Sequence, residues 1–236
     1  MPYSMMLDSG HGGSDPGAVY RGRREKDDTL RLTLAVGEIL QENGIEVLYT
    51  RTTDVYLSPY ERAVEANQAG VDFFLSIHRN SYPTDNEVMG VESLIYDLSG
   101  LKYQMAQEIN EQLETVGFVD LGVKARPNLV VLKRTRMPAV LVEAGFINSD
   151  TDNKLFDSNF QDIAQAIATG VLDTLENSRS SERTGNAGGT DEVPYSGRTV
   201  PEPEQCSEAA GNTGRPWISG IYRSVETILP GDFRRI

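Results

Sequence analysis

Only two histidines occur in this chain of 236 residues, and both lie in compact polar motifs that follow apolar runs. His11 is part of MMLDSGHGGSDPGA, and His78 is part of VDFFLSIHRNS. Imidazole is the commonest metal-ligating side chain, and polar, glycine-rich turns are not where a histidine fills a core. The pair therefore predicts a metal site, for which two ligands are still too few.

Two carboxylates are candidates for completing this site. Glu143 ends the apolar run AVLV, and Glu25 lies in the segment GRREK just before the first predicted helix. Two histidines and one carboxylate, with a fourth position open, form a familiar ligand set for catalytic zinc, and the second carboxylate then remains free as a general base. The residues alone leave open which of the two carboxylates is the ligand.

The amino-acid composition excludes some kinds of metal site and argues against some kinds of binding partner. Cys206 is the only cysteine, which excludes an intrachain disulfide and a four-thiolate zinc site. The 22 Lys and Arg against 35 Asp and Glu give a net charge of −13, which argues against nucleic acid as a partner because such binding depends on cationic neutralisation of phosphates. No segment has the length and apolarity of a membrane span, and no feature of the sequence predicts an oligomeric state.

The elements that must position these residues follow from the hydrophobic pattern. Apolar runs alternate with helical patterns as far as about residue 176, which predicts an α/β fold: one domain with a mostly parallel, twisted sheet of about six strands and helices on both faces. Strands are predicted at residues 3–7, 45–50, 72–77, 91–96, 128–132 and 139–142. Helices are predicted from Asp27 or Asp28 to residue 43, from Pro59 onward, over 101–116 and over roughly 160–175.

This sheet is the reason to expect the candidate residues together. His11 follows the first predicted strand, His78 closes the third, and Glu143 closes the last. The carboxyl ends of parallel strands meet at one edge of a sheet, where ligands bind. We therefore expect His11, His78 and Glu143 to share that edge.

The composition changes abruptly after Glu176. Residues 177–236 contain eight Gly, five Pro and no Lys, too little apolar surface to offset the entropy of ordering the chain. We therefore predict a catalytic domain at 1–176, a disordered linker at 177–215 and a short C-terminal segment of unassigned role at 216–236. Linker and segment together are predicted to form a flexible tail.

A series of segments between about residues 4 and 176 carries a family resemblance: LDSGHGGSDPGA, GRREK, TRTTDVYLSPYERAVEANQAGVDFFLSIHRNS, GVES and MPAVLVEAGFINS. In this order and spacing they resemble the zinc-dependent N-acetylmuramoyl-L-alanine amidases of the Amidase_3 type. The resemblance implies His11, Glu25 and His78 as ligands of Zn²⁺ and Glu143 as the catalytic carboxylate. It also implies a reaction, hydrolysis of the amide between N-acetylmuramic acid and L-alanine in peptidoglycan.

Residues beside His78 are predicted to contact the substrate. Asn80 fits the family pattern, whereas Arg79 stands where a small residue commonly follows the second histidine. Arg79 is expected to add a cation at the rim that meets a stem-peptide carboxylate. Arg51, Arg62 and Asn67 also fit the pattern, but they can equally hold loops through hydrogen bonds.

Two other functions agree with the same residues: a catalytically silent wall-binding module, and a zinc peptidase that cuts within stem peptides. The N-terminus MPYSMMLDSGH lacks the basic and apolar regions of a signal peptide. For an enzyme that acts on the cell wall, we therefore expect either a leaderless endolysin or sporulation enzyme, cytoplasmic until lysis or export, or a processed secreted autolysin.

Overall fold

The computed structural model describes residues 3–185. The strands of the main sheet are β1 (Ser4–Ser9), β4 (Glu46–Tyr49), β5 (Phe73–Asn80), β6 (Val91–Ile95), β7 (Asp120–Ala125) and β8 (Ala139–Phe146). A small hairpin consists of β2 (Val19–Tyr20) and β3 (Arg23–Arg24). The helices are α1 (Glu25–Glu42), α2 (Pro59–Ala69), α3 (Gly100–Val116), α4 (Val130–Arg134), α5 (Asp150–Ser158) and α6 (Phe160–Gly185).

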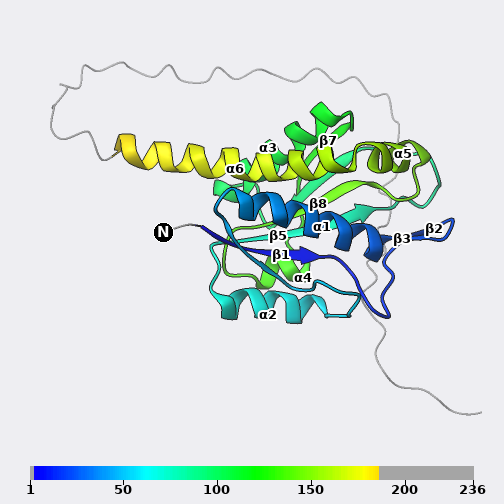
Figure 1. The fold of residues 1–236 in the computed structure, drawn as a ribbon, viewed down its shortest axis with the longest axis horizontal. Helices are drawn as coiled ribbons and strands as arrows, with labels where there is room; N and C mark the ends of the chain where they lie inside the picture. The colour runs from blue at the N-terminus through cyan, green and yellow to red at the C-terminus, as the bar shows by residue number, and fades with distance from the viewer. Residues whose placement is uncertain (1–2, 186–236) are drawn as a thin grey trace, which may run out of the picture. The chain divides into compact units, whose positions relative to one another are not determined.

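The main sheet has the strand order β4-β1-β5-β8-β6-β7 (Figure 1). Neighbouring strands pair in parallel except β6 and β8, which are antiparallel. Four adjacent strands, β4, β1, β5 and β8, therefore end at the same edge of the sheet. The predicted α/β fold with a mostly parallel sheet is confirmed.

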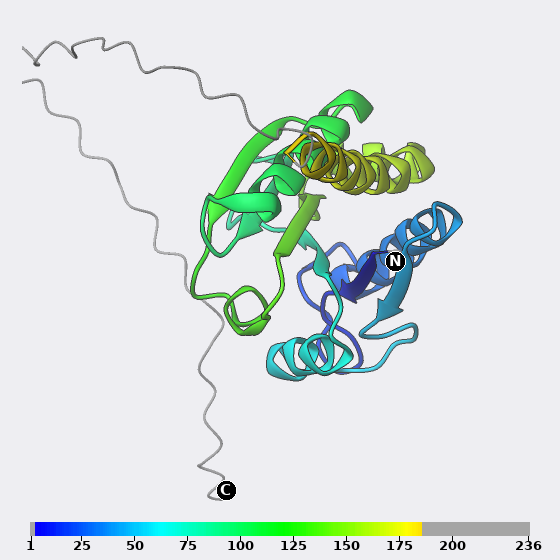
Figure 2. The same ribbon diagram turned by 90° about the vertical axis from the view of Figure 1, so that its left-hand side faces the viewer.

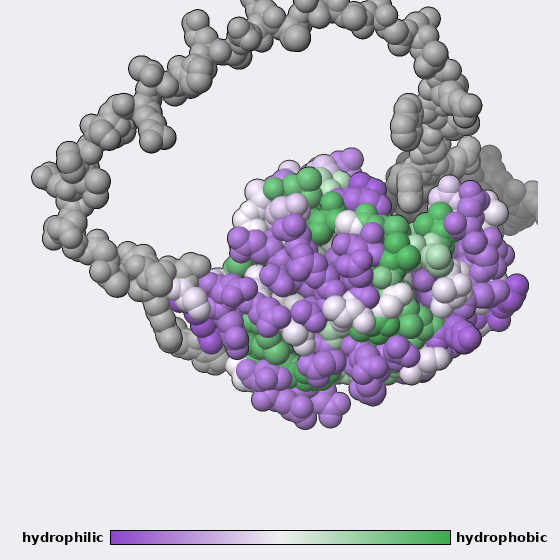
Figure 3. All heavy atoms as spheres, turned by 90° about the horizontal axis from the view of Figure 1, so that it is seen from above, coloured by the Kyte–Doolittle hydropathy of each residue, from purple (hydrophilic) through white to green (hydrophobic). Residues whose placement is uncertain are grey.

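Helices cover both faces of this sheet, with α1, α3 and α6 on one face and α2 and α4 on the other (Figures 1 and 2). Alternate residues of a strand point to opposite faces. Accordingly, Met5 and Leu7 of β1 belong to the core cluster under α1, α3 and α6, whereas Met6 belongs to the cluster under α2 and α4. Viewed from the α3 and α6 side, the surface is largely hydrophilic, with hydrophobic side chains in small patches (Figure 3).

Local sequence signals account for the start of α2 as predicted. Ser58 accepts a hydrogen bond from the backbone N–H of Glu61, and the Glu61 carboxylate accepts one from the Ser58 N–H, forming a capping box. Pro59 occupies the first helical position, where its missing N–H costs no hydrogen bond.

The predicted strand at 128–132 is wrong. Residues 130–134 form helix α4, whose Val131 and Leu132 are buried in the cluster under α2, so tertiary packing overrides the β-preference of this apolar run. The strand next to β6 at the edge of the sheet is instead β7, whose side chains are half-exposed. Its pairing with β6 changes register near Gly122, which has a φ of 82°. Because the strand is irregular and lies at the edge of the sheet, apolar and polar residues alternate only weakly in its sequence.

The end of the domain also differs from the prediction. Helix α6 runs to Gly185, so residues 177–185 of the predicted linker are helical. Its last buried apolar residue is Leu175, and once a helix is anchored, extending it by polar residues is inexpensive. The rest of the predicted linker and the segment 216–236 lie outside the described residues. Among the described helices, none combines the length and apolarity needed to cross a membrane.

Candidate metal centre

The edge at which the parallel strands end holds the predicted residues. Gly10 and His11 directly follow β1, while His78 and Glu143 lie opposite each other in the paired strands β5 and β8. Glu25 reaches the same place from a different element, since it is the first residue of α1, which the β2–β3 hairpin precedes. Helix α1 thus begins before Asp27, earlier than predicted, and its first side chain points into the site.

Three side chains converge here. The Oε2 atom of Glu25 lies 3.1 Å from Nε2 of His11, and its Oε1 atom lies 3.0 Å from Nδ1 of His78. The two imidazole rings meet edge to face, with centroids 4.9 Å apart. One potential ligand atom from each of the three residues lies within 4.8 Å of the others, so the group can hold a metal ion.

The Glu25 carboxylate is held rigidly in its ionised form. Its exposed fraction is 4 %, and it also accepts hydrogen bonds from the backbone N–H groups of Ala18 (2.9 Å) and Arg79 (3.0 Å). Burial opposes ionisation, but the hydrogen bonds and charges of His11 and His78 outweigh it and hold the pKa of Glu25 below its ordinary range. An ionised carboxylate beside two imidazoles is the donor set that a divalent transition metal requires.

His11 lies between two carboxylates. Its Nδ1 atom is 2.8 Å from Oδ2 of Asp15, on the side of the ring away from Glu25. Burial lowers the pKa of His11, but Glu25 and then Asp15 outweigh it and raise that pKa to about 9. In the protonated ring, Nε2 carries the additional proton and faces Glu25. A metal cation bound at Nε2 would supply the same positive charge. With Asp15 fixing the Nδ1 proton, Nε2 is the nitrogen left free to bind a metal.

Two glycines make room for this arrangement. A Cβ atom on Gly10 would lie 2.3 Å from Cε1 of His78, and one on Gly17 would lie 2.6 Å from both Glu25 and His11. His11 itself has a φ of 60°, a strained conformation for a residue with a side chain. The backbone is therefore shaped around the three side chains.

Glu143 differs from Glu25 in its surroundings. Its Oε2 atom is buried and has no hydrogen-bond partner among the described residues. Burial raises the pKa of Glu143 well above its ordinary value, and the negative charges of Glu25 and Glu92 raise it further. A buried carboxylate oxygen without a partner, next to a metal-ligating trio, fits a group that exchanges protons with a water or substrate.

Comparison with known proteins agrees with this geometry. Residues 5–173 match the Amidase_3 family, described as N-acetylmuramoyl-L-alanine amidase. The chain belongs to this family. The match includes all of the main sheet except Ser4, the first residue of β1, and all four residues of the site, and it supports a peptidoglycan amidase function.

Individual relatives cover most of the amidase domain. A sporulation-specific N-acetylmuramoyl-L-alanine amidase of Bacillus subtilis (strain 168) is 40% identical over 189 residues, which are 78% of this chain and 71% of the relative. An endolysin of Bacillus phage SPP1 is 34% identical over 203 residues, 82% of this chain and 73% of the relative. The crystal structure of an N-acetylmuramoyl-L-alanine amidase from Clostridium difficile 630 superimposes with a TM-score of 0.70 at 32% identity, covering 74% of this chain and 97% of that one.

Asn80 and Arg79, the two residues predicted to contact substrate, differ in how deeply they are buried in this amidase. Asn80 is half-buried and donates a hydrogen bond of 2.9 Å from Nδ2 to Oε1 of Glu92, so its contact with substrate stays a prediction. Arg79 is only 2 % exposed, and its Nη1 atom lies 2.7 Å from Oδ2 of Asp28. Its guanidinium carbon is 4.1 Å from the ring centroid of Phe156. This burial argues against the predicted contact between Arg79 and a stem-peptide carboxylate.

The two arginines that fit the family pattern, Arg51 and Arg62, hold the loop that carries His11. Buried Arg62 donates to Asp8 and to the carbonyl oxygen of His11, both at 2.7 Å. Arg51 donates to the carbonyl oxygens of Ser9 (3.0 Å) and Gly10 (2.8 Å). Arg51 and Arg62 therefore hold a loop through hydrogen bonds, which is one of the two roles that the sequence allowed.

Asp15 was missed by the sequence reasoning. It turns back toward His11 because Gly12 and Asp15 exchange two backbone hydrogen bonds, and its Oδ1 atom accepts one from the Gly17 N–H at 3.0 Å. The only available signal was its spacing, an acid four residues after a histidine within a glycine-rich turn.

Proposed function

We propose that this chain is a zinc-dependent N-acetylmuramoyl-L-alanine amidase that cuts the amide between N-acetylmuramic acid and L-alanine in peptidoglycan. His11, Glu25 and His78 hold the metal, and Glu143 is the catalytic carboxylate. The observation that carries the proposal is the unpartnered, buried Glu143 oxygen beside the three converging ligands.

When bound, zinc supplies a Lewis acid that polarises the scissile carbonyl and lowers the pKa of water. Glu143 takes a proton from the attacking water at its free Oε2 atom. It then delivers this proton to the nitrogen of L-alanine as the C–N bond breaks, which leaves a free amine and a lactyl carboxylic acid that loses the second water proton to solvent. Asp15 holds the Nδ1 proton of His11 throughout, so the ring keeps one orientation.

The raised pKa of Glu143 suits this exchange. A carboxylate with an ordinary pKa is a weak base near neutral pH, and an environment that disfavours its charge makes it a better acceptor for the water proton. Such a group has no use in a silent wall-binding module, because there it would be a buried polar oxygen with no partner.

Digestion of purified peptidoglycan tests the reaction. The amidase reaction exposes new alanine amino groups without new reducing ends. Release of reducing sugar would identify a glycosidase, and new termini inside the stem peptide would identify a peptidase; either result refutes the proposed bond.

The roles of the residues are tested by comparing Glu143→Gln with His78→Ala. Glu143→Gln keeps the size of the side chain and removes the base, so we expect bound zinc to remain and turnover to fall by about 10² to 10⁴. His78→Ala should lose the metal itself. Metal content measured by mass spectrometry beside turnover separates the two, and normal turnover in Glu143→Gln would overturn the assignment.

For localisation, we propose action on the cell wall, as for the sporulation amidase and the endolysin to which the chain is similar. The amidase function is assigned to the domain predicted at residues 1–176.

A further inference from the structure

A basic segment at residues 133–136 lies in a protein with a net charge of −13. It carries three exposed cations, Lys133, Arg134 and Arg136. Elsewhere in the domain, cations commonly face a carboxylate, as Arg62 faces Asp8. In the part of the chain that the structure describes, no ion pair is formed by any of these three cations. Three neighbouring cations with no internal partner form a concentrated positive charge that faces solvent.

The backbone of the basic segment is fixed in place. Asn67 of α2 clamps it from both sides, donating from Nδ2 to the carbonyl oxygen of Arg134 and accepting from the N–H of Arg136, both at 2.8 Å. The Thr135 hydroxyl donates to the carbonyl oxygen of Val131 at 2.7 Å. The charged side chains therefore extend from a preorganised turn, which lowers the entropy lost when a ligand orders them.

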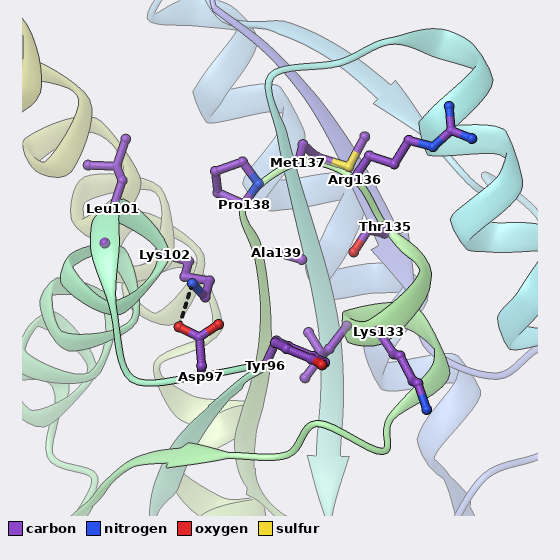
Figure 4. Close-up of a pocket in the computed structure, with 12 residues that line it drawn as sticks. Tyr96, Asp97, Leu101, Lys102, Lys133, Thr135, Arg136, Met137, Pro138 and Ala139 are labelled. Atoms are coloured by element: carbon purple, nitrogen blue, oxygen red, sulfur yellow. Dashed lines mark ion pairs between the residues drawn. The ribbon is translucent and has the colours of Figure 1, made fainter.

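A hollow lies on each side of the basic segment. One, of about 420 Å³, includes Tyr96, Lys102, Lys133 and Arg136 in its lining. The one acidic residue in its lining, Asp97, lies on the side of the hollow opposite Lys133 and Arg136 (Figure 4). Asp97 is paired with Lys102 at 2.9 Å. The other, of about 470 Å³, lies against α2 and has no acidic residue in its lining. Both hollows share Lys133, Thr135 and Arg136, so an extended ligand can occupy both while it crosses the cations.

Each hollow also contains an exposed tyrosine. Tyr96 is 42% exposed and lines the first hollow, and Tyr60 is 59% exposed and lines the second. A tyrosine ring offers an apolar face to the C–H groups of a sugar or polyol, and its hydroxyl stays in water. Cations in the centre with one aromatic ring on either side match a ligand that alternates anionic groups with carbohydrate units.

This surface is distant from the metal centre. The first hollow includes Ala139, where β8 begins, whereas Glu143 lies further along the same strand. At about 3.3 Å per residue the two positions are roughly 13 Å apart. His11 and His78 lie at the same edge as Glu143, so a ligand on the basic segment leaves the metal centre open.

We propose that the basic segment and its two hollows bind an anionic carbohydrate polymer that carries no nucleobases and in which phosphodiester groups alternate with sugar or polyol units. Arg and Lys pair with the phosphates, and Tyr60 and Tyr96 contact the carbohydrate. A duplex nucleic acid is disfavoured, because its charge is dense, one per about 1.7 Å, whereas the chain has a net charge of −13 and this basic segment is only four residues long. For a wall enzyme, a second contact of this kind would hold the domain on its substrate layer; that use rests on the proposed function, whereas the binding itself does not.

The test uses the full chain and a synthetic glycerol-phosphate oligomer, with affinity measured by titration calorimetry from low to high salt. Replacing Lys133, Arg134 and Arg136 together by Gln should weaken binding at least about tenfold at low salt and lower the log–log salt slope by about one per cation. The matched control replaces Arg31, Lys154 and Arg179 by Gln, with the same change in net charge on exposed cations of α1, α5 and α6. The control should bind like the wild type.

A second pair of variants tests the carbohydrate contact. Tyr60→Ala with Tyr96→Ala should weaken binding of the glycerol-phosphate oligomer by about threefold to tenfold and leave binding of inorganic polyphosphate unchanged. The proposal is overturned if the wild type does not bind the oligomer, if the control triple variant loses as much affinity as the test variant, or if single-stranded DNA or poly-glutamate of equal charge binds as tightly. Hydrolysis of a soluble muropeptide should be equal in all variants, so an inactive protein that still binds would refute only the proposed function.

Discussion

Removal of the Asp28 charge should weaken both the fold and the metal site. Asp28 lies on the first turn of α1, three residues after Glu25, and its Oδ2 atom accepts from Arg79 at 2.7 Å and from Arg23 at 2.6 Å. Arg79 follows His78 in β5, and its backbone N–H donates to Glu25. The Arg79–Asp28 pair thus joins the helix that carries one ligand to the strand that carries another.

The size of the effect follows from the burial of this pair. The side chains of Arg79 and Asp28 are 1% and 9% exposed, and loss of one partner of a buried pair costs about 3–5 kcal/mol because the other charge is left uncompensated. Arg79 keeps a hydrogen bond to Oδ1 of Asn153 at 2.8 Å, so for Asp28→Asn we expect the low end, about 3 kcal/mol. Loosening of a contact behind the ligands typically lowers metal affinity by about 10- to 100-fold, and we expect that loss for zinc.

A neighbouring residue provides the matched control. Asp27 pairs with Arg24 at 2.7 Å, but there both side chains are about half exposed, at 48% and 50%. Asp27→Asn is the same substitution on the same helical turn and should cost less than about 1 kcal/mol, with zinc affinity unchanged. Denaturant unfolding of the metal-free protein and zinc competition with a chelator measure the two effects separately.

Two results would refute this reasoning. If Asp28→Asn is no less stable than Asp27→Asn, the buried pair does not contribute as its geometry indicates. If Asp28→Asn is destabilised but binds zinc like the wild type, the pair supports the fold alone. The double variant with Arg79→Met should show a coupling energy of at least about 1 kcal/mol, as expected for side chains in direct contact.

Three further predictions concern the metal centre. Asp15→Asn should lower zinc affinity by about 10- to 100-fold in chelator competition, with little change in the stability of the metal-free protein, because the Nδ1 proton of His11 loses its acceptor charge. Unfolding of the metal-free protein should show a free energy that falls by up to about 3 kcal/mol between pH 6.5 and 9, since His11 has a raised pKa of about 9 and its stabilising charge is complete only below its unfolded value; His11→Gln should remove this decline. Gly10→Ala should abolish zinc binding measured by mass spectrometry, as its Cβ would lie 2.3 Å from the His78 ring, whereas Gly22→Ala, which has open space around its Cβ and carries only the backbone strain of its φ of 86°, should retain it.

The sheet was predictable because its strongest signals are local. The apolar runs that became β1, β5 and β8 are long and buried, and the rule that parallel strands end at one edge then brings His11, His78 and Glu143 together without further information. The edge strand β7 lacks such a signal, since its side chains are half-exposed and Gly122 interrupts its alternation. Sequence reasoning thus finds the strands that carry the site more readily than those that complete the sheet.

The residues around the ligands were less predictable, because their roles depend on which elements pack together. Glu25 reaches the site only because α1 begins where the short β2–β3 hairpin ends, and no hydrophobic pattern marks a hairpin of two-residue strands. Arg79 follows His78 in sequence and was therefore expected at the rim. In a strand, however, neighbouring side chains point to opposite faces, so a residue next to a ligand at the edge is directed into the layer beneath α1 and α5. This alternation explains why the arginine became an internal support.

The same sheet geometry separates the two surfaces assigned to this amidase. Strands β1, β5 and β8 end at the metal centre, so the opposite edge, where β5 and β8 begin, is free of the constraints that shape the ligands. The basic segment begins in the last turn of α4, leads into β8 at that edge and is held by Asn67 of α2; both helices lie on the face away from α1. Substitutions at Lys133, Arg134 and Arg136 should therefore change binding without moving Glu25 or His78. A change of zinc affinity in the triple Gln variant would show instead that β8 transmits strain from one edge to the other.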